Sequence, residues 1–280
     1  MKALSQEQIQ FYKDKGYLLV EDVLKPSDLQ PLIDEFDAVI DKWADEYHRQ
    51  GRLKDLFEDE PFSRRLYRIY NAVDHPHEVW TAVNGKNMKT AGMFAVMTHP
   101  AILDIVESVI GPEILAHPQF NSRAKLPNLE AMVVPWHQDL GYLYPDAEET
   151  FMVNFWIPLV NATVENGCME VISGSHKHGL IPHEQIAGYL GIPESKLPPG
   201  EVVPCPVRVG SVLLILHKTI HRSIPNRSDH IRWSLDLRYS DPALPTGRDH
   251  VPGFIARSAK KPESVAKSHL DWLKLFEGHH

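Results

Sequence analysis

The sequence predicts a mainly β protein, a sandwich or barrel, with helices flanking it. After about residue 113, short apolar or alternating runs are separated by glycine and proline turn signals, a pattern typical of such folds. Before that point, apolar residues recur at helical spacing. A chain of 280 residues can bury a sizeable core, and β barrels of this size are often one domain. We therefore expect the early helices to cover one sheet.

Each early element has a local signal. Ser5 followed by Gln8 predicts a capping box at the start of the first helix, and Gly16 predicts its end. The longest helix is amphipathic, because apolar residues recur from Leu29 to Trp43 at helical spacing. The expected elements are a helix between Ser5 and Gly16, a strand at 17–21, a helix beginning at Pro26 and a helix over 100–110.

The expected strands follow in the second part of the chain. They cover 113–118, 131–136, 151–160, 167–173, 202–209, 211–216, 220–224 and 231–240. Since no internal repeat or low-complexity linker divides the chain, we predict a single domain. Its parts are a helical region of about 1–112, a β core of about 113–240 and a C-terminal extension of 241–280.

The composition disfavours several classes of function. A formal charge of −8 provides no basic field for nucleic acid or an anionic membrane surface. No run of about 18 apolar residues predicts a membrane span, and the N-terminus lacks the apolar stretch of a secretory signal. Two cysteines without a CxxC pair fit a reducing cytoplasm, so we expect a cytoplasmic protein. His279 and His280 resemble the remnant of a purification tag.

The segment from Pro135 to Tyr142 carries the first chemical signal. In an extended strand, residues two apart point to the same side, so His137 and Asp139 can present an imidazole and a carboxylate to one metal ion. This pattern alone is weak, because a hydrogen-bonded surface pair has the same spacing.

A second histidine strengthens the signal. The segment 210–226 is predicted to be an apolar strand, a turn and a short strand that begins near His221. Two histidines and one carboxylate form a facial triad, which leaves coordination positions open and suits iron(II) oxygenases. Zinc fits less well, because it prefers four-coordinate sites with more histidines or with cysteines.

The strand 231–239 places polar side chains on one face. Arg232, Ser234, Asp236 and Arg238 alternate with apolar or aromatic residues. An arginine that faces a barrel interior needs an anionic partner, and its planar fork suits the distal carboxylate of 2-oxoglutarate. The alternative partner for Arg232 is Asp236. We expect Arg238 to form a structural ion pair with Asp236.

These motifs resemble the phytanoyl-CoA dioxygenase family of iron(II)/2-oxoglutarate oxygenases. The matching pieces, in the family's order, are the opening segment 8–20, Trp136-His-Gln-Asp-Leu, Asn154-Phe-Trp156, the stretch 165–176, His221-Arg-Ser-Ile-Pro-Asn226 and Arg232. The resemblance extends from about residue 5 to 240. One departure is Gly210-Ser211, where relatives usually carry Gly-Asp in a turn.

The resemblance implies a double-stranded β-helix, a jelly roll of the cupin type, with the metal between its two sheets. It implies Fe(II) ligands at His137, Asp139 and His221, and a carboxylate anchor at Arg232. The other co-substrate contacts that it implies are Ser223, Trp156, Asn121 and Arg68. The family's HRSxPN context favours His221 over His217 as the ligand.

The implied reaction consumes O2 and 2-oxoglutarate, releases succinate and CO2, and hydroxylates a C–H bond of a small molecule. A halogenase is disfavoured, because Asp139 fills the position that a halide would need. The alternatives are an iron dioxygenase that needs no oxoacid, a zinc hydrolase or isomerase, and a non-catalytic ligand-binding barrel. The substrate pocket is expected from the loops 69–97, 142–150, 177–200 and 240–258.

Overall fold

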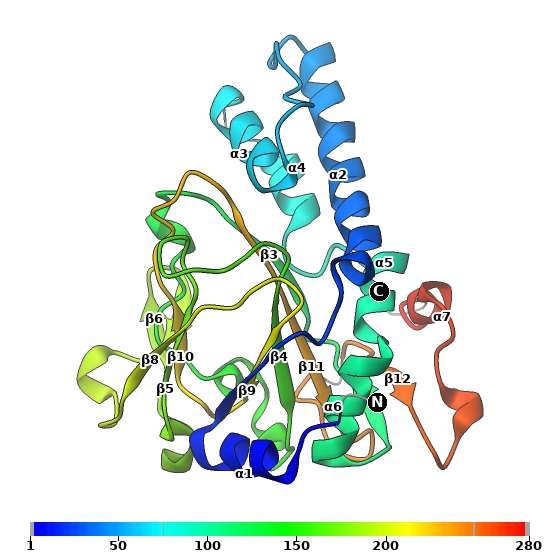
Figure 1. The fold of residues 1–280 in the computed structure, drawn as a ribbon, viewed down its shortest axis with the longest axis vertical. Helices are drawn as coiled ribbons and strands as arrows, with labels where there is room; N and C mark the ends of the chain where they lie inside the picture. Colours follow the sequence, from blue (N-terminus) through cyan, green and yellow to red (C-terminus); the bar gives the residue numbers. More distant parts are fainter. Residues whose placement is uncertain (1–2, 75, 249, 278–280) are drawn as a thin grey trace.

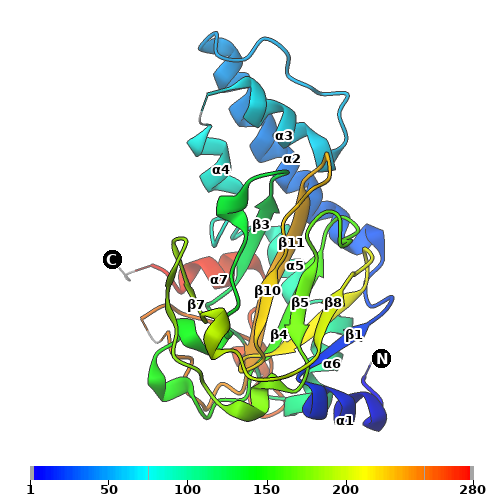
Figure 2. The same ribbon diagram turned by 90° about the vertical axis from the view of Figure 1, so that its left-hand side faces the viewer.

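Two facing antiparallel sheets form the centre of the molecule in this computed structural model (Figure 1). It describes residues 3–74, 76–248 and 250–277, so His279 and His280 lie outside the described residues. The larger sheet has the strand order β1-β9-β4-β11-β2-β12, and β3 also pairs with β11. The smaller sheet has the order β10-β5-β8 (Figure 2), and β6 and β7 form a separate hairpin. The predicted double-stranded β-helix is confirmed.

The strands are β1 (Tyr17–Val20), β2 (Ile114–Ala116), β3 (Asn121–Lys125), β4 (Val153–Pro158), β5 (Met169–Ile172), β6 (Glu184–Ile186), β7 (Tyr189–Gly191), β8 (Val202–Cys205), β9 (Val212–Leu216), β10 (His221–Ser223), β11 (Arg232–Ser240) and β12 (Phe254–Arg257). The helices are α1 (Gln6–Lys15), α2 (Pro26–Arg49), α3 (Phe62–Ala72), α4 (His77–Val83), α5 (Ala91–Met97), α6 (Pro100–Ile110) and α7 (His269–Lys274).

The first helix begins and ends where the sequence predicts. Ser5 and Gln8 form the capping box of α1, in which each side chain accepts a hydrogen bond from the other residue's backbone N–H. Gly16 closes the helix with a φ of +80°, and a Cβ there would lie 2.4 Å from Thr219 Oγ1. Glycine is therefore required both by the left-handed conformation and by the close approach. The chain then enters β1, which pairs with β9.

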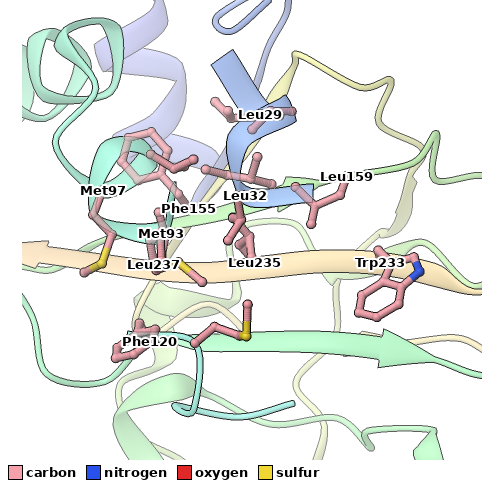
Figure 3. Packing of buried hydrophobic residues seen from close by; sticks show 14 of the residues in the cluster. Leu29, Leu32, Met93, Met97, Phe120, Phe155, Leu159, Trp233, Leu235 and Leu237 are labelled. Atoms are coloured by element: carbon pink, nitrogen blue, oxygen red, sulfur yellow. The ribbon is translucent and has the colours of Figure 1, made fainter. Parts of the chain in front are cut away.

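Helices cover the outer face of the larger sheet. Figure 3 shows Leu29 and Leu32 of α2 packed beside Phe155 of β4 and Leu235 and Leu237 of β11. All five side chains are at most 1% exposed. Burial of apolar surface stabilises the fold by roughly 25 cal/mol per Å², so this helix-on-sheet layer holds the larger sheet against α2.

Aromatic side chains join β11 to the helices. The ring of Trp233 stacks on Phe62, with centroids 4.7 Å apart, and lies 5.1 Å from the ring of Phe36. Phe36 belongs to α2 and Phe62 to α3. The strand that carries the predicted carboxylate anchor is therefore packed against two helices through Trp233.

No segment was expected to be long and apolar enough to cross a membrane. By length and composition alone, the stretch Ala91–Ile110 is. It forms two helices here. His99 caps the second helix by accepting a hydrogen bond from Ala101 N, and Pro100 is its first residue. The buried hydrophobic residues of α5 and α6 belong to the main hydrophobic core.

The segment before the metal-binding motif differs from the prediction. A strand was expected at 131–136, but Glu130–Met132 is a short 3₁₀ helix. His137 pairs with His221 in a single bridge, and a 3₁₀ helix begins at Asp139. The backbone is extended at Gln138, but the expected strand is reduced to the single bridge at His137.

Candidate metal centre and adjoining cavity

Three potential metal-binding side chains converge between the two sheets. The ligand atoms of His137, Asp139 and His221 all lie within 4.8 Å of one another. His137 and His221 exchange reciprocal backbone N–H···O hydrogen bonds of 3.0 Å, so the two imidazoles project from neighbouring positions. The sequence predicted this grouping, and the structure brings the three residues together.

Backbone carbonyls orient both imidazoles. His137 Nδ1 lies 2.8 Å from the carbonyl oxygen of Pro135, and His221 Nδ1 lies 2.9 Å from that of Thr219. When Nδ1–H donates to these carbonyls, each Nε2 lone pair is left for a metal ion. Burial and the neighbouring His221 lower the pKa of His137 to about 3, so its ring is neutral near pH 7.

The carboxylate is held on both oxygens. Asn154 Nδ2 donates to Asp139 Oδ2 at 2.6 Å, and the Arg238 guanidinium donates to Asp139 Oδ1. Burial by itself would raise the pKa of Asp139, but the charge of Arg238 holds that pKa below its usual range. The carboxylate is therefore ionised and fixed, as a metal ligand requires.

The expected ion pair between Arg238 and Asp236 is wrong. Arg238 pairs with Asp139, and Asp236 accepts a hydrogen bond of 2.6 Å from Arg123 Nε. Arg238 reaches a carboxylate 99 residues away in the chain, whereas Arg123 lies on β3, the strand paired with β11 at Asp236. Arg123 comes from a neighbouring strand and Asp139 from a 3₁₀ helix, so spacing within β11 does not determine the pairing.

A cavity that opens to solvent adjoins the triad. Its walls come from both sheets and from the loop after α4. The residues that line it beside the triad include Trp80, Asn84, Arg123, Lys125, Met132, Asn154, Trp156, Tyr189, Ser223, Arg232 and Asp236. Of the loops predicted to form the pocket, 69–97 and 177–200 contribute through Trp80 and Tyr189. The prediction is wrong for 142–150 and 240–258, whose described residues do not line this cavity.

Arg232 is buried in the wall of this cavity and is 2% exposed. It donates from Nη1 to Ser234 Oγ at 2.6 Å, and its guanidinium lies over the Trp156 ring, 5.1 Å from the centroid. Its Nε has no hydrogen-bond partner among the described residues. The alternative pairing with Asp236 is not formed, because Asp236 hydrogen-bonds to Arg123.

Lys125 is a cavity residue that the sequence analysis missed. It is 3% exposed, and its Nζ donates to Ser223 Oγ at 2.8 Å. It lies directly opposite Arg232 in the pairing of β3 with β11. Sequence offered little signal, because β3 lacks the apolar alternation by which strands are recognised. Asn154 was also missed as a partner of Asp139, although it lies in a segment that resembles the family.

Three other predicted or considered residues lie elsewhere. Arg68 is on α3, where its side chain is 54% exposed and pairs with Glu60 at 3.6 Å. Asn121 lies on β3 opposite Asp236 but is not among the residues that line the cavity. His217 is buried near Phe151 and is not part of the triad.

A jelly roll with two histidines and a carboxylate between its sheets defines the class of cupin-type proteins with a mononuclear metal centre. A family model described as phytanoyl-CoA dioxygenase (PhyH) matches residues 12–234. The chain belongs to this family, which confirms the resemblance found in its motifs.

Similar proteins agree with this placement. Phytanoyl-CoA dioxygenase 1 of Oryza sativa subsp. japonica is 27% identical over 270 residues, covering 85% of this chain and 90% of the rice protein. The peroxisomal phytanoyl-CoA dioxygenase of Homo sapiens is 28% identical over 182 residues, covering 65% of this chain and 50% of the human protein.

Solved structures share the fold. The non-heme monooxygenase ThoJ matches with a TM-score of 0.65 and 20% identity, covering 97% of this chain and 94% of ThoJ. The epimerase SnoN, solved with Fe3+, alpha ketoglutarate and nogalamycin RO, matches with a TM-score of 0.56 and 19% identity over 87% of each chain. At these identities the likeness concerns the fold.

Proposed function

We propose that this protein is an iron(II)- and 2-oxoglutarate-dependent oxygenase that oxidises a C–H bond of a small molecule. The observation that carries the proposal is one cavity that combines two different sites. It holds a two-histidine, one-carboxylate group, and a buried guanidinium whose Nε has no hydrogen-bond partner among the described residues. Family membership and the fold of the relatives support the same function.

The donor set fits iron(II). His137, Asp139 and His221 would hold the metal and leave open positions for a chelating oxoacid and O2. Arg232 and Ser223 would bind the distal carboxylate, and Trp156 would pack against the co-substrate. When bound, the iron and the oxoacid supply oxidative decarboxylation to succinate and CO2, coupled to oxidation of the substrate. The protein residues orient the imidazoles, keep Asp139 ionised and fix the co-substrate.

An oxidoreductase of this type must also bind its primary substrate beside the metal and the co-substrate. Trp80 and Met132 line both the main cavity and a neighbouring hollow beside Tyr70. These two side chains are aromatic and apolar, whereas Lys125 and Arg232 give another part of the lining its polar character. We propose that the primary substrate lies against Trp80 and Met132. An oxoacid-independent dioxygenase is a poorer match, because it supplies no anionic partner for the buried Arg232.

The first prediction tests the metal ligands. His137→Ala and His221→Ala should each lose iron binding and 2-oxoglutarate-dependent succinate release while remaining folded, because each removes one of three protein ligands. Iron content after anaerobic loading and succinate formation are the measurements. His217→Ala is the matched control and should retain the iron. If His217→Ala lost the iron and His221→Ala kept it, the assignment of His221 would be overturned.

A further inference from the structure

Three hydrogen-bond donors gather in one part of the cavity lining. They are the guanidinium of Arg232, the ammonium of Lys125 and the hydroxyl of Ser223, and all three residues line the cavity. The three side chains are between 2% and 3% exposed. Arg232 and Lys125 come from neighbouring strands of the larger sheet, and Ser223 comes from the smaller sheet.

The hydrogen-bonding capacity of this group is incompletely used. Ser223 Oγ accepts from Lys125 Nζ at 2.8 Å and from the backbone N–H of Val134 at 3.3 Å, so its own hydrogen is free to be donated. An ammonium has three donors, of which Lys125 uses one here. Arg232 Nε has no partner among the described residues. A carboxylate, which accepts at about four lone-pair positions, can receive all of these donors.

The charges of Lys125 and Arg232 also favour a bound carboxylate. Lys125 and Arg232 are directly opposite each other in an antiparallel pair, where like charges are destabilising. The nearby acids are engaged elsewhere, since Asp236 binds Arg123 and Glu130 pairs with Arg227 at 2.5 Å. No described carboxylate is hydrogen-bonded to either buried cation. Among the described residues the protein therefore provides no anion that would allow Lys125 and Arg232 both to carry a charge in this buried place.

We propose that Lys125 is a second anchor for the distal carboxylate of the co-substrate, which it binds jointly with Arg232 and Ser223. The consequence is specificity, because a 2-oxo acid without a distal carboxylate leaves Arg232 without an anion and gives Lys125 no partner for a positive charge. This inference rests on the proposed function, and it adds to it a residue that determines which oxoacids are accepted.

The test compares two oxoacids that differ only at the distal end. 2-Oxopentanoate has the carbon chain of 2-oxoglutarate but ends in a methyl group. Each ligand is titrated anaerobically into the iron-loaded protein, and the iron–oxoacid absorption band gives its Kd. Lys125→Met should raise the Kd for 2-oxoglutarate about 10- to 100-fold, the range for one charge-assisted hydrogen bond. The Kd for 2-oxopentanoate should stay unchanged.

Lys89→Met is the matched control, because Lys89 is half-buried, does not line the cavity and donates to the Lys86 carbonyl. It should change neither Kd. Lys125→Gln keeps a polar side chain and replaces Lys125→Met if the methionine variant does not fold. Equal weakening of both oxoacids would reveal a purely structural role for Lys125, and no weakening of either would also overturn the inference. A wild-type protein without any iron–oxoacid band would instead refute the proposed function.

Discussion

Lys125 occupies an environment in which a lysine loses most of its hydration. Burial, followed by the positive charges of Arg232 and Arg123, lowers the pKa of Lys125 to about 6. The weaker influences of Glu130 and Cys168 act in the opposite direction. Above pH 6 the side chain is therefore largely neutral in the protein without co-substrate. A carboxylate bound against it favours the charged form, so binding takes up a proton.

This coupling predicts a pH dependence of co-substrate affinity. Because the bound state holds more protons than the free state, the Kd for 2-oxoglutarate should rise as pH increases above about 6, by at most tenfold per unit. 2-Oxoglutarate is fully ionised throughout this range and contributes nothing to the slope. Anaerobic titrations between pH 6 and 9 measure the effect. The slope should vanish in Lys125→Met, and an equally steep slope in that variant would contradict the explanation.

The sequence predicts some of these residues and not others for a physical reason. His137 and Asp139 share a local spacing, and a motif of adjacent residues identifies His221. Lys125 and Arg238 depend instead on which strands pair and in what register. Arg238 meets Asp139 across 99 residues of sequence. Arg68 was instead predicted as a co-substrate contact from its approximate position in the family resemblance, but it is an exposed residue of a helix.

The strand β11 has two chemically different faces. Arg232, Ser234, Asp236 and Arg238 alternate with buried apolar residues, as the sequence predicted for 231–239. One face lines the cavity, and the other packs against α2 and α3. Neighbouring β3 was not predicted as a strand in its own right, because its charged residues serve the cavity and only small side chains, Ser122 and Ala124, alternate with them.

The packing of Trp233 leads to a prediction about stability. Trp233→Ala should lower the free energy of unfolding by about 3–5 kcal/mol, because it leaves a cavity between β11, α2 and α3. Urea-induced unfolding measures this loss. Trp233→Phe should recover most of it, since Trp233 Nε1 has no hydrogen-bond partner among the described residues and the indole N–H contributes little. Equal losses in the two variants would show that ring packing is not the cause.

Across the whole molecule, the residues that would hold the iron and the co-substrate come from both sheets. His221 and Ser223 come from the smaller sheet, whereas Arg232 and Lys125 come from the larger one. Iron and co-substrate would therefore connect the two sheets in addition to occupying the cavity. The order of early helices and later strands was predicted from periodicity. The way in which the two sheets pack face to face at this site depends on long-range strand pairing, which no local pattern encodes.

This arrangement predicts that ligands stabilise the fold. With iron bound, 2-oxoglutarate at 100 times its Kd should add about 2.7 kcal/mol to the stability of the folded state. That corresponds to a rise in Tm of roughly 5–10 °C, at about 2–4 °C per kcal/mol. Differential scanning calorimetry under anaerobic conditions measures the rise. A chelator or His221→Ala should reduce it strongly. An undiminished rise without metal would place the oxoacid away from the triad.

The two-faced character of β11 also determines which changes of chain length the protein can tolerate. Inserting or deleting one residue within this strand would exchange its faces beyond that point. Downstream arginines would enter the layer against α2, and leucines would face the cavity. A two-residue insertion would restore the alternation but move Arg238 along the strand by about 7 Å relative to Arg232. Length variation among similar chains should therefore fall in the loops around β11, where neither face is disturbed.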